Sequence, residues 1–167
     1  CIRDRPKTLK PVEITADTAL ECDVVVVGSG AGGGTAAAVL QQAGLDPDRV
    51  GLHDDPPQAA MHDELARRRV YVHPVRWTSL GLSLLEAMHL GMPVVGLATT
   101  EAVEAVPAEA GVLSTRPERL AEAVRHFVAE PDAARLAGKV ARAAALERYG
   151  LGRFLADWDA LLAEVTR

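Results

Sequence analysis

Residues 78–95 contain the residue types expected of a turn and helix that bind phosphate. The stretch reads TSLGLSLLEAMHLGMPVV, with a turn at Gly81, an apolar helix that carries the single carboxylate Glu86, and a stop at Gly91. A helix that follows a glycine turn presents unpaired backbone N–H groups and the positive end of its macrodipole, which together favour a bound phosphate. The candidate phosphate-binding residues are therefore Gly81, Leu82, Ser83 and Leu84.

Glu86 is the one acid in this helix. We expect it to be buried, because its neighbours are the apolar residues Leu82, Leu84, Leu85, Ala87 and Met88. A buried carboxylate is costly unless something hydrogen-bonds to it, and adjacent hydroxyls of a ribose would do so. The sequence therefore predicts a phosphate site with a ribose-binding acid about one turn inside the helix.

The pattern G-L-S-L-L-E-A-M-x-x-G-x-P-V-V resembles the donor-site signature of retaining nucleotide-sugar glycosyltransferases of group 1 (family 4), which have the two-domain GT-B architecture. The resemblance implies that the glycine-led loop holds the diphosphate of a nucleotide sugar and that Glu86 binds the ribose. The family has a second glutamate eight positions earlier, which contacts the sugar, and this chain has Thr78 there. Glu86 and Thr78 are thus the candidate catalytic residues.

A second glycine motif lies nearer the start of the chain. The β-branched run 22–27 ends in Gly28, Gly30 and Gly33, which fit G-x-G-x-x-G and precede an Ala-rich helix over 35–43. Strand, glycine turn and helix in this order are typical of dinucleotide binding, so these glycines are candidate nucleotide-binding residues. The same glycines would also serve as a tight turn in any α/β sheet.

Two families resemble this first third of the chain. Residues 15–45 resemble the FAD-binding start of glucose-methanol-choline oxidoreductases, which implies a flavin. The order of strand, helix and a short strand at 48–52 also resembles the transferase donor domain. Only the transferase resemblance extends over the remainder, from about residue 45 to residue 167.

Further candidates follow two predicted strands. In the resembling family, the strand that matches 70–74 leads directly into the donor loop, which implies that His73 and Arg76 are positioned to meet a ligand, Arg76 as a phosphate partner. A lone histidine such as His73 is more often a structural residue than a ligand contact. The buried strand at 93–98 is followed by Thr99 and Thr100, which could line the pocket.

Alternating strands and helices predict an α/β fold with a Rossmann-like parallel sheet flanked by helices. The transferase resemblance implies that this unit is one half of a GT-B enzyme. We expect an extended arm over 1–21 and the nucleotide-sugar-binding domain over 22–167. Helices are expected at 59–69, 118–129, 132–149 and 153–165, the last with its apolar side in the core: Phe154, Leu155, Trp158, Leu161 and Leu162.

Charge and residue composition limit the classes of function that this chain could have. A net charge of -5 gives no general attraction to nucleic acid or to an anionic membrane. Cys1 and Cys22 are too few for a disulfide scaffold, so a cytoplasmic protein is expected. No membrane span is visible, and the five histidines have no metal-ligand spacing. The first residue is Cys rather than Met, which suggests a fragment or a processed chain.

Three hypotheses follow. The first is a donor domain that binds a nucleotide diphosphate sugar for retaining transfer, needs no cofactor, and is incomplete without an acceptor domain or partner chain. The second is an FAD-binding oxidoreductase fragment. The third is a non-catalytic Rossmann-like binding module that forms a homodimer.

Overall fold

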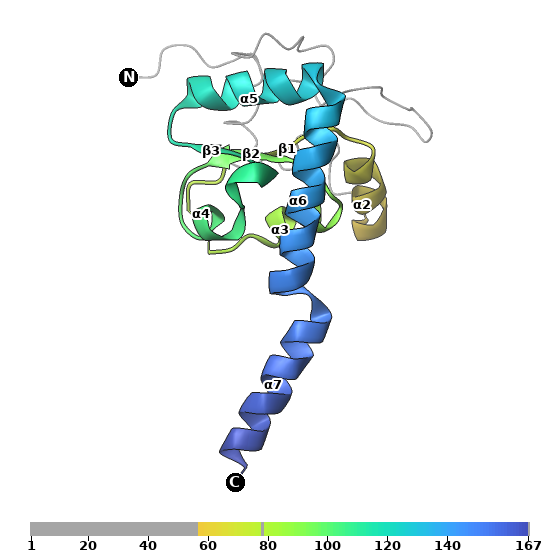
Figure 1. Cartoon of the computed structure of the whole chain (residues 1–167), viewed down its shortest axis with the longest axis vertical. Coiled ribbons are helices and arrows are strands. Elements are labelled where there is room, and N and C mark those ends of the chain that lie inside the picture. The colour runs from red at the N-terminus through yellow and green to blue at the C-terminus, as the bar shows by residue number, and fades with distance from the viewer. Residues whose placement is uncertain (1–56, 78, 167) are drawn as a thin grey trace.

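The computed structural model describes residues 57–77 and 79–166, which are coloured in Figure 1. Strands and helices alternate along most of this length, as the sequence predicts. In chain order the elements are α2 (Gln58–Ala66), β1 (Tyr71–His73), α3 (Leu82–His89), β2 (Val94–Leu97), α4 (Ala102–Ala105), the 3-10 turn η2 (Ala108–Ala110), β3 (Gly111–Ser114), α5 (Pro117–Ala129), α6 (Pro131–Tyr149) and α7 (Leu151–Val165).

The three described strands form a parallel sheet in the order β1-β2-β3. Tyr71 pairs with Val94 and His73 with Gly96, and the register continues from β2 to β3. Because the strands are parallel, their carboxyl ends at His73, Leu97 and Ser114 meet at one edge of the sheet. The predicted parallel α/β sheet is confirmed.

Each face of the sheet is covered by its own hydrophobic cluster, since successive strand residues point to opposite faces. Figure 1 shows α5 on one face and α3 with α4 on the other. The cluster on the α5 face includes Val70, Val72, Val95, Leu120, Val124 and Phe127. The cluster on the α3 face includes Leu84, Met88, Val94, Ala102 and Ala105, with Tyr71 and Leu113 packed against it.

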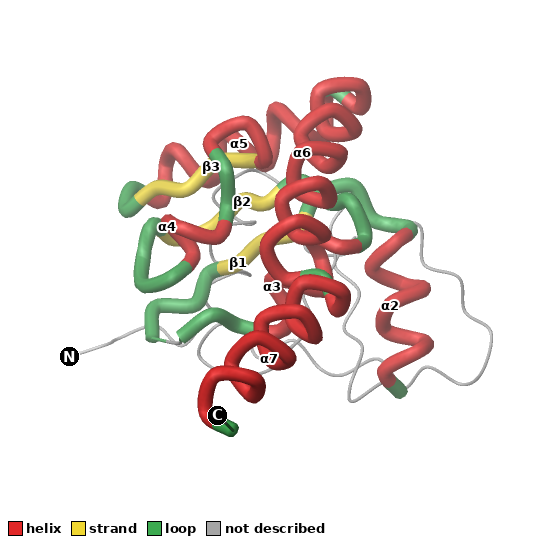
Figure 2. Tube along the Cα trace, turned by 60° about the horizontal axis from the view of Figure 1, so that its bottom comes forward, coloured by secondary structure: helices red, strands yellow, loops and turns green. Residues whose placement is uncertain are grey.

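Helix α6 lies across the amino ends of the strands. Its small residues Ala134 and Ala137 join the cluster on the α5 face, and Ala141 and Ala145 join the cluster on the α3 face. Gly138, between these pairs, packs on the backbone of Gly91, just before β2. Figure 2 shows α6 running past the sheet beside α3. The amino edge of the sheet is therefore covered.

Helix α7 continues from α6 and extends away from the rest of the described chain (Figure 1). The sequence predicts that its apolar residues lie in the core, and that prediction is wrong. The helix has no buried residue, and its large apolar side chains are about half exposed: Phe154, Leu155, Trp158, Leu161 and Leu162. Helical spacing shows which residues share one side of a helix, but it does not show whether anything covers that side.

The arginine run after α2 also differs from expectation. The sequence predicts a helix to residue 69, whereas α2 ends at Ala66 and Arg67 is its C-cap. Arg68 and Arg69 instead lead into the bridge at Val70 and the strand β1. Gly28, Gly30, Gly33, Thr78 and the proposed boundary between 21 and 22 lie outside the described residues.

Candidate functional site

The start of α3 lies at the carboxyl edge of the sheet, where the loop after β1 delivers it. Gly81 is the N-cap, and its carbonyl accepts hydrogen bonds from the amides of Leu84 at 3.1 Å and Leu85 at 3.4 Å. The two amides before them, of Leu82 and Ser83, belong to the first helical turn, where intrahelical acceptors do not exist. These two N–H groups are the ones suited to a phosphate oxygen.

The predicted phosphate-binding residues differ in exposure. Ser83 and Leu82 are exposed, with Leu82 at 75%, whereas Leu84 is 1% exposed and belongs to the core. The amide of Leu84 also donates a hydrogen bond to the carbonyl of Gly81, so the role of Leu84 is structural. Arg76, from the loop before Gly81, is exposed.

The loop after β2 is tied to the loop after β1. The hydroxyl of Thr99 donates to the carbonyl of Val75 at 3.0 Å, so Thr99 lies beside the loop that carries Arg76. Thr100 follows with φ of 49°, a left-handed conformation that is uncommon for a β-branched residue. The two threonines predicted for this edge are thus placed there by an ordered turn.

Glu86 lies one turn inside α3, on the side that faces α2. Its side chain is 25% exposed, and its Oε1 is 3.4 Å from Nε2 of His62. The prediction that apolar neighbours bury it is therefore only partly right, because Leu82 is exposed and leaves that side open. A carboxylate has several acceptor positions, so a partly exposed one can accept a hydrogen bond from a hydroxyl in addition to its contacts within the protein.

Two residues of β1 contribute polar groups under the start of α3. The hydroxyl of Tyr71 donates to Oγ of Ser83 at 3.0 Å, and it is 3.3 Å from Nδ1 of His73. Sequence reasoning missed Tyr71, although Tyr71 and His73 are two residues apart in a strand and so share a face. That spacing was the available signal.

His73 does not reach the surface, so of the two interpretations that the sequence leaves open, a structural residue or a ligand contact, the structure favours the structural one. It is 3% exposed, and a Cβ on Gly81 would lie 3.5 Å from its Cε1, which places the ring beneath the glycine turn. Burial lowers the pKa of His73, so the ring is neutral at pH 7. Burial also raises the pKa of Tyr71, with a smaller opposing effect of the Ser83 hydrogen bond and a further increase from the charge of Glu86.

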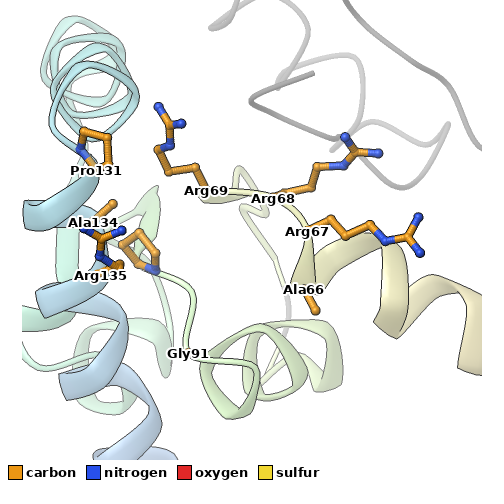
Figure 3. A pocket seen from close by; sticks show the side chains of 9 residues that line it. Ala66, Arg67, Arg68, Arg69, Gly91, Pro131, Ala134 and Arg135 are labelled. Carbon is orange, nitrogen blue, oxygen red and sulfur yellow. The ribbon is translucent and has the colours of Figure 1, made fainter. Parts of the chain in front are cut away.

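A basic hollow of about 350 Å³ lies at the opposite, amino edge of the sheet (Figure 3). Four arginines line it, and each has a hydrogen-bond partner within the chain: Arg67 and Arg68 on Glu64, Arg69 on the carbonyl of Val128, and Arg135 on Asp132. Its lining includes Gly91 and Pro93, which precede β2, whereas Gly81 and Thr99 follow strands. The hollow is therefore separate from the start of α3.

Within the described residues, no group of three or more His, Cys, Asp or Glu side chains is placed to hold a metal ion. In the same part of the chain, every helix is too short or too polar to cross a membrane.

Solved structures show where this fold occurs. The chain matches sucrose-phosphate synthase from Thermosynechococcus elongatus with a TM-score of 0.70 and 24% identity, over 86% of this chain and 38% of that one. It matches TarM of S. aureus, in a complex with UDP, with a TM-score of 0.64 and 21% identity, over 82% and 28% of the two chains. It matches HepE of Anabaena, in a complex with UDP-glucose, with a TM-score of 0.64 and 20% identity, over 84% and 40%.

The chain thus spans less than half the length of each of these proteins. A search of curated proteins by sequence found no match. The family model described as "Glycosyl transferases group 1" matches residues 8–130, which include the turn at Gly81, Glu86 and all three strands of the described sheet. By this match over most of its length, the chain belongs to the group 1 glycosyl transferases.

Proposed function

We propose that this chain is the donor-binding half of a retaining glycosyltransferase and binds the nucleoside diphosphate part of a nucleotide sugar. In this proposal, the first-turn amides of α3 and the hydroxyl of Ser83 bind the diphosphate, and Arg76 adds a guanidinium. Glu86 accepts hydrogen bonds from the ribose. Thr99 and Thr100 line the side where the sugar lies, and Thr78 stands at the sequence position whose glutamate contacts the sugar in the resembling family.

The observation that carries this proposal is the open start of α3 beside Glu86. The exposed Ser83 and the partly exposed Glu86 are three residues apart in one helix, so they lie on neighbouring parts of its surface. A nucleoside diphosphate has its phosphates and ribose hydroxyls at a similar separation along one molecule. The UDP and UDP-glucose complexes named for TarM and HepE support this choice of ligand class.

The test is thermal unfolding of the chain with and without UDP-glucose. A ligand at a hundredfold excess over its Kd stabilises the folded state by about 2.7 kcal/mol, which is a readily measured rise in Tm. Glu86→Ala should abolish that rise. Glu122→Ala is the matched control, since its 58%-exposed carboxylate lies on α5, which covers the other face of the sheet from α3. No rise with any nucleoside diphosphate sugar would refute the proposal.

We further propose that the uncovered side of α7 contacts an acceptor-binding domain. The matched enzymes are more than twice as long as this chain, so each has room for a second domain. The apolar stripe of α7 is the largest uncovered group of apolar side chains among the described residues. Transfer would then need both halves, and this chain alone would bind the donor but transfer sugar poorly.

Sedimentation equilibrium tests that assignment against a second copy of the same chain. We expect a monomer whose α7 residues bind a hydrophobic dye, with the signal reduced by Trp158→Glu. A stable dimer that dissociates on Trp158→Glu would contradict the acceptor-domain assignment and support a homodimer.

We propose that the nucleotide sugar is the substrate and that no flavin is bound. The transferase family match begins at residue 8 and so includes the segment with Gly28, Gly30 and Gly33, which supports a transferase origin for that segment too. The purified protein should be colourless, and flavin absorbance that is lost on Gly30→Val would refute this. We place the protein in the cytoplasm, where Cys1 and Cys22 would stay reduced.

A further inference from the structure

The Tyr71 hydroxyl is the centre of a short hydrogen-bonded chain beneath the donor site. It lies 3.0 Å from Oγ of Ser83 and 3.3 Å from Nδ1 of His73. Ser83 is the second residue of α3 and is exposed, whereas His73 is 3% exposed. The chain therefore runs from the core to the surface at the start of α3.

A phosphate oxygen at the start of α3 would select one direction for these bonds. When Ser83 donates its proton to that phosphate, its Oγ accepts from the Tyr71 hydroxyl. The single proton of the phenol is then used, so the Tyr71 oxygen accepts from Nδ1 of His73 in the tautomer that carries the proton there.

We propose that Tyr71 and His73 are positioning residues for the donor's diphosphate, because their hydrogen bonds orient the Ser83 hydroxyl to donate to a phosphate oxygen. This rests on the function proposed above. Three donors in sequence, from His73 to Tyr71 to Ser83, polarise one another in the direction that favours an anion at the end. The first-turn amides and the dipole of α3 favour an anion at the same place.

The surroundings keep this arrangement fixed. The Tyr71 ring packs among side chains of α2 and α3, in a cluster with Leu65, Ala87 and Met92. Burial and the charge of Glu86 raise the pKa of Tyr71, so the phenol keeps the proton that it donates. Gly96 pairs with His73, and a Cβ there would lie 3.1 Å from the Cβ of His73, so the glycine gives His73 its space.

The experiment is calorimetric titration of the chain with UDP and, separately, with uridine. Tyr71→Phe removes only the hydroxyl, and Ser83→Ala removes the group that it orients. We expect each variant to lose about five- to tenfold in affinity for UDP, and the double variant to lose no more than Ser83→Ala alone. Affinity for uridine, which has no phosphate, should not change.

The conservative variant Ser83→Thr keeps a hydroxyl at the same position and should keep most of the affinity for UDP. A general loss of structure would weaken UDP and uridine equally, so equal losses in Tyr71→Phe would overturn the positioning role. Additive losses in the double variant would overturn it as well. Failure of the unchanged protein to bind any nucleoside diphosphate would instead refute the proposed function, and with it this role.

Discussion

Gly138 in α6 packs directly against the carbonyl of Gly91, the residue with φ of 77° that turns the chain from α3 into β2. A Cβ on Gly138 would overlap that oxygen. The close contact brings α6 against the amino ends of the strands and lets its alanines join both clusters. One small residue thus sets the distance between α6 and the sheet.

We expect Gly138→Ala to destabilise the protein by about 1–3 kcal/mol, because the added methyl group must displace backbone rather than a flexible side chain. Urea unfolding followed by circular dichroism measures this. Gly152→Ala is the control, since a Cβ on Gly152 in α7 would meet nothing within 4 Å. That variant should gain up to about 1 kcal/mol from helix propensity. Equal effects of the two changes would contradict the packing argument.

The two phenylalanines, Phe127 and Phe154, offer a test of the two helical environments. Phe127 in α5 is 6% exposed and Phe154 in α7 is 55% exposed. Phe127→Ala should cost about 3–5 kcal/mol through the cavity it leaves, and Phe154→Ala should cost about 0.5 kcal/mol or less. Tm values of both variants provide the comparison. A large loss in Phe154→Ala would mean that α7 packs on something in the isolated chain.

His73 should make stability depend on pH. Its folded-state pKa lies below the ordinary value of 6.5, so between the two values the unfolded chain binds more protons than the folded one. The contribution of His73 to the free energy of unfolding is therefore fully present above about pH 6.5, and it is lost as the pH falls through the lowered pKa. Denaturant unfolding between pH 8 and pH 5 measures this, with His73→Asn as a polar variant that does not titrate. An unchanged pH dependence in that variant would assign the effect to other groups.

Removing the side chain of Thr100 should make the folded protein more stable. Its φ of 49° suits glycine, and a β-branched residue there costs on the order of 1 kcal/mol. Thr100→Gly should therefore raise the free energy of unfolding by roughly 0.5–1 kcal/mol, measured by urea titration. The neighbouring substitution Thr99→Gly should lower the free energy of unfolding by about 1 kcal/mol, because it removes the hydrogen bond to the carbonyl of Val75. A loss in both variants would show that the Thr100 side chain has a structural partner.

Local patterns were enough to predict most of the described fold. The turn at Gly81, the helix after it and the strand after Gly91 each have a local chemical cause, so they were placed to within a residue or two. The α5 residues predicted to face inward, Leu120, Val124 and Phe127, are buried as expected. Glycine turns and apolar spacing act over a few residues, which is why sequence alone reveals them.

Features that depend on distant parts of the chain could not be predicted in this way. The exposure of α7 depends on which surfaces lie near it, and the hydrogen bond from Tyr71 to Ser83 joins residues twelve apart. The spacing of Tyr71 and His73 places both on one face of β1, but neighbouring residues do not show that the Tyr71 hydroxyl also meets Ser83 of α3. Tertiary partners, not local propensity, decided these cases.

Helix α6 packs at the amino ends of the strands, whereas the loops that contain Arg76 and Thr99 follow the carboxyl ends. Under the proposed function, the contacts that hold the helix on the sheet and the groups that bind the donor therefore lie at opposite ends of the same strands. An exposed residue such as Arg76 could then be exchanged, and ligand preference changed, without disturbing the alanine and glycine contacts under α6.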